Sequence, residues 1–130
     1  MAARILVIED NGPSLRLMTY LLKAFGYEPL SATDGVEGLR IAEEEHPDLV
    51  ICDIQLPKLD GYGVARALKA AAPLGEARII AVTASAMVGD RERVLAAGFD
   101  GYITKPIAPE TFVRDAETFL PDALRAKRAS

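Results

Sequence analysis

Acidic side chains stand at the ends of two apolar stretches of the sequence. The stretch ILVIEDNGPS runs from four apolar residues into Glu9 and Asp10, and the stretch LVICD ends on Asp53. If the three carboxylates converge, a pair about 4 Å apart repels by about 4 kcal/mol at an effective dielectric constant of 20. Such a cluster must bind either a proton or a cation. Of the cations, Mg²⁺ suits an all-oxygen, partly hydrated site with few protein ligands, so we expect Mg²⁺.

Two further polar groups follow apolar stretches later in the chain. IIAVT ends on Thr83, and GYIT is followed at once by Lys105 and Pro106. Ammonium groups and Mg²⁺ both bind phosphoryl oxygens, and an aspartate can act as the nucleophile that forms an aspartyl-phosphate. Asp53 is the natural acceptor because it stands alone at the end of the central apolar run. Taken by itself, an Asp that caps the next loop would look the same.

Short apolar stretches alternate with helical patterns along the chain. The expected strands are 4–9, 28–32, 49–53, 79–83 and 101–104. Helices are expected where apolar residues recur on one face: Leu15, Met18, Leu22 and Phe25; Val36, Leu39 and Ala42; and within 63–71, 87–97 and 110–120. The inner stripe of the last helix is Phe112, Val113, Ala116 and Phe119. Alternating strands and helices predict an α/β fold whose ligand site lies beyond the carboxyl ends of parallel strands.

Composition excludes several classes of protein. The 130 residues fit one domain, and a net charge of -4 without a basic stripe argues against binding to nucleic acid. The single cysteine, Cys52, cannot form an internal disulfide, and its place in a buried strand predicts core packing. No apolar run reaches the length of about 20 residues that a membrane-spanning helix needs, and no signal peptide is recognisable. We therefore expect a cytoplasmic protein that is not embedded in a membrane.

Four stretches together resemble the receiver domain of two-component response regulators: ILVIEDN, PDLVICDIQLPKLDGYGV, IIAVTASAM and GYITKPI. With the patterns between them, they cover essentially the whole chain. The resemblance implies a flavodoxin-like, doubly wound α/β fold, with a five-stranded parallel sheet of order 2-1-3-4-5 and five helices. It places the receiver at residues 1–121, followed by a short tail, 122–130, and no output domain. Met1 and the finished tail favour a complete protein over an excised fragment.

The resemblance implies a role for each acidic position. Asp53 would be the phosphoacceptor and Asp10 a direct Mg²⁺ ligand, while Glu9 would act mainly through metal-bound water. Gln55 would offer its backbone carbonyl to the metal. Gln55 and Ser85 also occupy the two positions that tune self-dephosphorylation in relatives.

The same resemblance implies a switch. Thr83 would hydrogen-bond one phosphoryl oxygen and Lys105 would pair with another, with a cis peptide bond between Lys105 and Pro106. Tyr102 would rotate into the space that Thr83 vacates. The alternative is that Tyr102 is an exposed tyrosine on an edge strand and never moves.

A signalling role follows from the resemblance. The domain would take a phosphoryl group from a phosphohistidine on a histidine kinase or a histidine phosphotransfer protein, catalysing its own phosphorylation and slow dephosphorylation. The donor would dock near the first helix, at 14–22. The surface formed by the fourth helix, fifth strand and fifth helix would then regulate a partner protein, from a monomer or a phosphorylation-dependent dimer. The alternative is a phosphorelay intermediate, or the receiver of a hybrid histidine kinase, that passes the phosphoryl group onward.

Three rival classes fit the sequence less well. A phosphohydrolase of the haloacid dehalogenase type needs a second acid two residues after the nucleophile, where this chain has Gln55. A flavodoxin needs a phosphate loop rich in glycine and hydroxyl groups, but EDNGPS puts carboxylates there. The nucleotide-binding patterns GxxxxGK[ST] and GxGxxG are both missing from the sequence.

Overall fold

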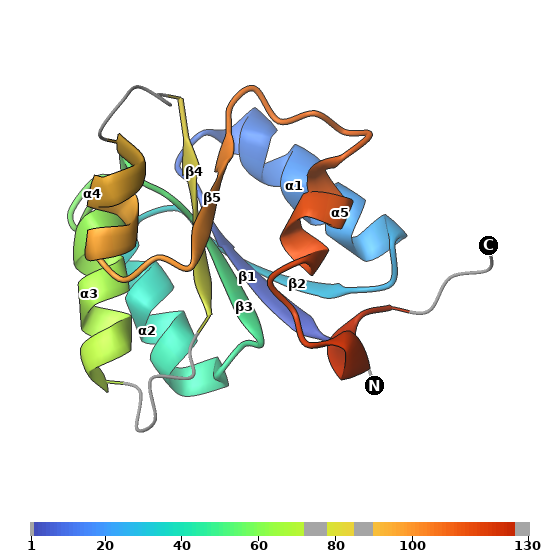
Figure 1. The fold of residues 1–130 in the computed structure, drawn as a ribbon, viewed down its shortest axis with the longest axis horizontal. Helices are drawn as coiled ribbons and strands as arrows, with labels where there is room; N and C mark the ends of the chain where they lie inside the picture. The colour runs from blue at the N-terminus through green and yellow to red at the C-terminus, as the bar shows by residue number, and fades with distance from the viewer. Residues whose placement is uncertain (1, 72–77, 85–89, 127–130) are drawn as a thin grey trace.

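Five parallel strands form the centre of the molecule in a computed structural model that describes residues 2–71, 78–84 and 90–126 (Figure 1). The strands are β1 (Arg4–Ile8), β2 (Glu28–Ala32), β3 (Leu49–Asp53), β4 (Ile79–Thr83) and β5 (Gly101–Thr104). Their order in the sheet is β2-β1-β3-β4-β5. This confirms the predicted fold, and four of the five predicted strands have the predicted bounds. The exception is β1, which ends at Ile8, one residue before Glu9.

Helices cover both faces of the sheet. They are α1 (Gly12–Ala24), α2 (Gly35–Glu45), α3 (Gly61–Ala71), α4 (Asp90–Ala96) and α5 (Phe112–Glu117). Figure 1 shows α1 and α5 on one side of the sheet and α2, α3 and α4 on the other. Among the described helices, none is long and apolar enough to cross a membrane.

Alternate residues of each central strand enter two separate hydrophobic cores. Ile5 and Val7 of β1 pack with α1 and α5, whereas Leu6 and Ile8 pack with the helices of the opposite face. This follows from the period of two along a strand. Because both faces of β1, β3 and β4 are covered, these strands are apolar almost throughout, and a polar residue at their ends stands out.

Three helices differ in extent from the prediction. The third helix begins at Gly61 rather than at residue 63, because Oδ1 of Asp60 accepts a hydrogen bond from the Gly63 N–H at 2.9 Å and caps the first turn. The last helix is shorter than the predicted 110–120, although its inner stripe still faces the core, where Phe119 packs against the cluster that contains the buried Phe112. The fourth helix ends at Ala96, one residue before its predicted end, and its predicted start, residue 87, lies outside the described residues.

The chain after α5 packs on the body of the protein. Residues Asp122–Leu124 form a 3-10 helix, and the backbone N–H of Ala126 donates a hydrogen bond to the Tyr27 hydroxyl at 2.9 Å. Leu124 and Ala126 also contact the core under α1 and α5. Within the tail, the polar stretch RAKRAS, residues 125–130, predicts a loose end of the chain. This prediction is wrong for Arg125 and Ala126, which both hydrogen-bond to the body of the protein. The buried phenol of Tyr27 supplies the polar partner that holds this segment.

Candidate functional site

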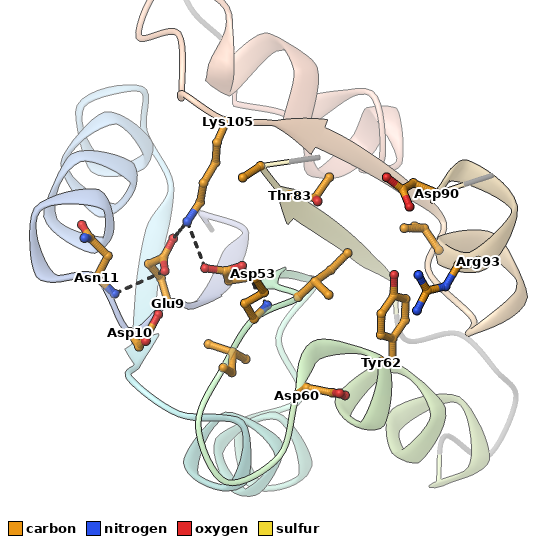
Figure 2. A pocket seen from close by; sticks show the side chains of 15 residues that line it. Glu9, Asp10, Asn11, Asp53, Asp60, Tyr62, Thr83, Asp90, Arg93 and Lys105 are labelled. Atoms are coloured by element: carbon orange, nitrogen blue, oxygen red, sulfur yellow. Dashed lines mark hydrogen bonds and ion pairs between the residues drawn. The ribbon is translucent and has the colours of Figure 1, made fainter. Parts of the chain in front are cut away.

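The carboxyl ends of four strands meet at one edge of the sheet, where the strand order reverses between β1 and β3. Here Glu9, Asp53, Thr83 and Lys105 line one cleft of about 720 Å³ (Figure 2). Its remaining lining residues are Asp10, Asn11, Ile54, Gln55, Leu56, Asp60, Tyr62, Ala84, Asp90, Arg93 and Val94. The position agrees with the rule that open α/β sheets bind ligands beyond the carboxyl ends of their strands.

Lys105 joins two of the acids. Its Nζ lies 2.8 Å from Oε1 of Glu9 and 2.9 Å from Oδ2 of Asp53 (Figure 2). The backbone N–H of Lys105 donates to the Thr83 carbonyl at 2.8 Å, and the following bond to Pro106 is cis, as the resemblance implies. The chain after β5 therefore directs the ammonium back over the end of β3.

The acidic cluster fits a hard divalent cation. One carboxylate oxygen from each of Glu9, Asp10 and Asp53 lies within 4.8 Å of the others. Glu9 is 0% exposed, and its Oε1 accepts no hydrogen bond from the described residues, although it is ion-paired with Lys105. Three carboxylates with one ammonium leave a deficit of positive charge that Mg²⁺ would reduce. The donor atoms are all oxygens, which is the set that Mg²⁺ prefers.

Asp53 is held in place by its neighbours. It is 6% exposed, and its Oδ1 accepts a hydrogen bond from the backbone N–H of Gln55 at 3.1 Å. Its other oxygen is the one paired with Lys105. The backbone of Gln55, which the resemblance assigns to the metal site, thus lies directly beside the Asp53 carboxylate.

Burial changes the ionisation of Glu9. Removal from water, followed by its contact with Asp53, raises the pKa of Glu9 to about 7, although Lys105 and the N–H of Asn11 act in the opposite direction. Burial alone would lower the pKa of Lys105, but its bonds to Glu9 and Asp53 outweigh burial and raise that pKa. Burial also raises the pKa of the Cys52 thiol, which stays neutral inside the core, as predicted.

A pH dependence of stability follows from Glu9. Because its folded pKa lies above the ordinary 4.5, the folded protein holds more protons than the unfolded chain between about pH 4.5 and 7, and stability falls as pH rises through that range. In metal-free buffer, we expect the free energy of unfolding to fall by an amount on the order of 2 kcal/mol over this range, and we expect Glu9→Gln to abolish this fall. Urea unfolding of both proteins at pH 5, 6 and 7, in the presence of a chelator, measures the change. Parallel profiles for the two proteins would contradict the assignment.

The two residues to which the resemblance assigns a switch lie on neighbouring strands, Thr83 at the end of β4 and Tyr102 on β5. Thr83 is half-buried and lines the cleft. Tyr102 is also half-buried, packs against the core under α2, α3 and α4, and borders a second groove between β5 and α5. The alternative of an exposed tyrosine is therefore wrong as regards exposure. Ser85 lies outside the described residues.

The predicted site did not include the side of the cleft opposite Lys105. This side carries Arg93, whose guanidinium carbon lies 5.4 Å from the centroid of the Tyr62 ring (Figure 2). Tyr62 in turn meets Phe99 edge-on, with ring centroids 6.3 Å apart. Asp60 and Asp90 complete this side. In the sequence, the stretch DGY predicts only a turn before the third helix, so it does not mark Asp60 and Tyr62 as part of a site.

The fold and the acidic cleft together define a flavodoxin-like protein with a cluster of carboxylates, suited to a divalent cation, at its switch point. The sequence model of the response regulator receiver domain matches residues 5–117. The chain belongs to this family of two-component signalling domains, as the sequence motifs predicted.

Relatives agree with this assignment. The chain is 41% identical over 123 residues to the polar-differentiation response regulator DivK of Brucella ovis, across 95% of this chain and 100% of that protein. The chain is 40% identical to DivK of Brucella anthropi over the same length. Both relatives are response regulators, in agreement with the resemblance that the sequence motifs carry.

Solved structures agree as well. Chemotaxis response regulator CheY4 of Vibrio cholerae superposes with a TM-score of 0.87 at 25% identity, over 92% of this chain and 100% of that one. The receiver domain of sensor histidine kinase PA1611 from Pseudomonas aeruginosa PAO1 gives 0.83 at 34% identity, over 92% and 98%. That structure has a magnesium ion coordinated in its active site cleft.

Proposed function

We propose that Asp53 accepts a phosphoryl group from a phosphohistidine on a histidine kinase or a histidine phosphotransfer protein. A carboxylate oxygen of Asp53 attacks phosphorus, the phosphorus–nitrogen bond breaks, and the imidazole leaves. The observation that carries the proposal is the position of this carboxylate, buried at the end of β3 between Lys105 and the Gln55 N–H. The reaction is the domain's own, so the chain is a signalling protein with slow self-dephosphorylation and not an enzyme acting on other substrates.

The residues that would hold Mg²⁺ are Asp10 and Asp53 directly, Glu9 mainly through water, and Gln55 through its backbone carbonyl. Bound there, Mg²⁺ supplies positive charge that offsets the phosphoryl oxygens as they approach a cluster of carboxylates. Lys105 would supply a second positive charge, because its ammonium already contacts Asp53.

Phosphorylation adds about two negative charges at the end of β3. Thr83, which lines the same cleft, gains an acceptor for a charge-assisted hydrogen bond, and its displacement opens room for Tyr102. Tyr102 lies on β5 beside the groove against α5, so its movement changes the surface formed by α4, β5 and α5. This surface would regulate a partner protein. The donor would dock at α1, in the cytoplasm, and phosphorylation would act on a monomer or drive a dimer.

A phosphorelay is the second candidate. The PA1611 relative is the receiver domain of a sensor histidine kinase, and it shares more identity with this chain than CheY4 does, 34% against 25%. In a relay, the phosphoryl group on Asp53 passes onward to a histidine. Return of label from the phosphorylated chain to a histidine phosphotransfer protein would favour the relay, and retention would favour the switch.

Thr83→Ala and Lys105→Ala test the switch. Each should retain phosphorylation by a small phosphodonor better than it retains partner binding, since both side chains read the phosphoryl group while Asp53 receives it. The measurement compares acyl phosphate formation with capture of protein partners on beryllofluoride-treated chain. Thr83→Ser keeps the hydroxyl and should preserve the coupling. Equal loss of phosphorylation and of capture in the Ala variants would argue against a switch role.

A further inference from the structure

The loop between β3 and α3, residues 54–60, touches the first turn of α2 backbone to backbone. A Cβ added at Gly35, the first residue of α2, would lie 1.7 Å from the carbonyl oxygen of Leu59 and 2.7 Å from its carbonyl carbon. The N–H of Gly35 donates to the Pro57 carbonyl at 3.4 Å. No side chain fits at position 35 unless the loop moves, because backbone and not a flexible side chain occupies the space.

The other side of the loop is confined by α3. A Cβ at Gly61 would lie 2.5 Å from the Asp53 carbonyl oxygen and 2.7 Å from the Ile54 Cα, and the Gly61 N–H donates to the Ile54 carbonyl at 2.8 Å. Lys58, at the loop's tip, has a φ of 71° and lies 3.5 Å from the Asp34 carboxylate that caps α2. The loop is therefore packed between the N-termini of α2 and α3. A displacement of the loop at α2 would also move the residues next to Asp53.

We propose that Gly35 is a positioning residue for the metal site. Its lack of a side chain lets α2 set the position of the loop that brings the Gln55 backbone beside Asp53, and thereby sets affinity and selectivity for Mg²⁺. The inference rests on the proposed function, which places Mg²⁺ among Glu9, Asp10 and Asp53.

The ratio of Mg²⁺ affinity to Ca²⁺ affinity distinguishes a change in loop position from a general loss of structure. Mg²⁺ requires nearly ideal octahedral geometry, whereas Ca²⁺ accepts a larger and more flexible set of oxygens. Displacement of the Gln55 carbonyl therefore costs Mg²⁺ binding more than Ca²⁺ binding. A uniform loss of folded protein lowers both affinities equally and leaves their ratio unchanged.

The test is titration calorimetry of the full chain with Mg²⁺ and, separately, with Ca²⁺. Gly35→Ala is expected to weaken Mg²⁺ binding by about 10- to 100-fold, the range for residues that support metal ligands, and Ca²⁺ binding by much less. Circular dichroism at the titration temperature establishes that the variant is folded. An unchanged ratio of Mg²⁺ to Ca²⁺ affinity would overturn the proposal.

Gly38→Ala is the matched control within α2. Its added Cβ would lie 2.4 Å from Cδ1 of Ile8, at the end of a side chain and away from the loop. It should lower stability and leave the affinity ratio unchanged; a fall in the ratio equal to that of Gly35→Ala would also overturn the proposal. Pro57→Gly loosens the loop without a clash and should lower the ratio to a smaller extent. If Gly35→Ala does not fold, an unchanged ratio in Pro57→Gly overturns the proposal instead.

Asp10→Ala distinguishes a failure of the proposed metal site from a failure of the positioning role of Gly35. Absence of Mg²⁺ binding by the unsubstituted chain, or full binding by Asp10→Ala, contradicts the metal site itself. Loss of binding in Asp10→Ala together with an unchanged ratio in Gly35→Ala contradicts only the positioning role.

Discussion

Asp53→Asn is expected to abolish phosphorylation of the chain by a small phosphodonor in the presence of Mg²⁺. An amide lacks the nucleophilic carboxylate oxygen, so no acyl phosphate forms. The fold should persist, because the Asn oxygen can still accept the hydrogen bond from the Gln55 N–H and Lys105 keeps its ion pair with Glu9. The measurement is incorporation of label that hydroxylamine releases, as expected for an acyl phosphate, with thermal unfolding as the check on folding.

Asp60→Asn provides the control within the same cleft. Asp60 lines the cleft, and its side-chain oxygen caps α3 through the Gly63 N–H, which an Asn can also do. This variant should be labelled like the unsubstituted chain. Persistent labelling of Asp53→Asn, or its transfer to Asp60, would refute the assignment of the phosphoacceptor.

The sequence predicts the sheet well because the sheet is buried on both faces. β3 and β4 read as continuous apolar runs that no amphipathic helix would show, and their predicted bounds are those of the structure. β2 and β5 lie at the edges and carry weaker patterns, yet regular alternation with helices locates them. Helix ends are harder, as α5 shows, because they depend on local capping and packing and not on periodicity alone.

The acids at the end of β1 show what the sequence could not reveal. Glu9 and Asp10 look alike in the sequence, but Glu9 is fully buried and paired with Lys105, whereas Asp10 is exposed. Glu9 follows β1 directly and its side chain is buried against Lys105, whereas Asp10 lies in the bend that follows and faces water. Which acid is which depends on where β5 delivers Lys105, 96 residues after Glu9, and no local pattern contains that information.

Contacts between helices and those with the end of the chain are likewise outside the reach of local patterns. Arg93 over Tyr62 requires the relative placement of α3 and α4, and the bond from Ala126 to Tyr27 joins residues 99 positions apart. In each case the individual residues are ordinary for a helix surface or a chain end. Their pairing arises only once the sheet has brought the elements together.

Asp10→Ala should remove Mg²⁺ binding and leave the domain folded. Asp10 is exposed and belongs to the cluster of carboxylates, so its loss removes a ligand without opening the core. At a Mg²⁺ concentration 100 times the dissociation constant, binding stabilises the unsubstituted protein by about 2.7 kcal/mol, and we expect almost none of this gain in Asp10→Ala. Titration calorimetry and urea unfolding with and without Mg²⁺ measure both quantities. Asp60→Asn, outside the cluster, should keep the full gain, and an equal Mg²⁺ affinity in Asp10→Ala would count against the metal site.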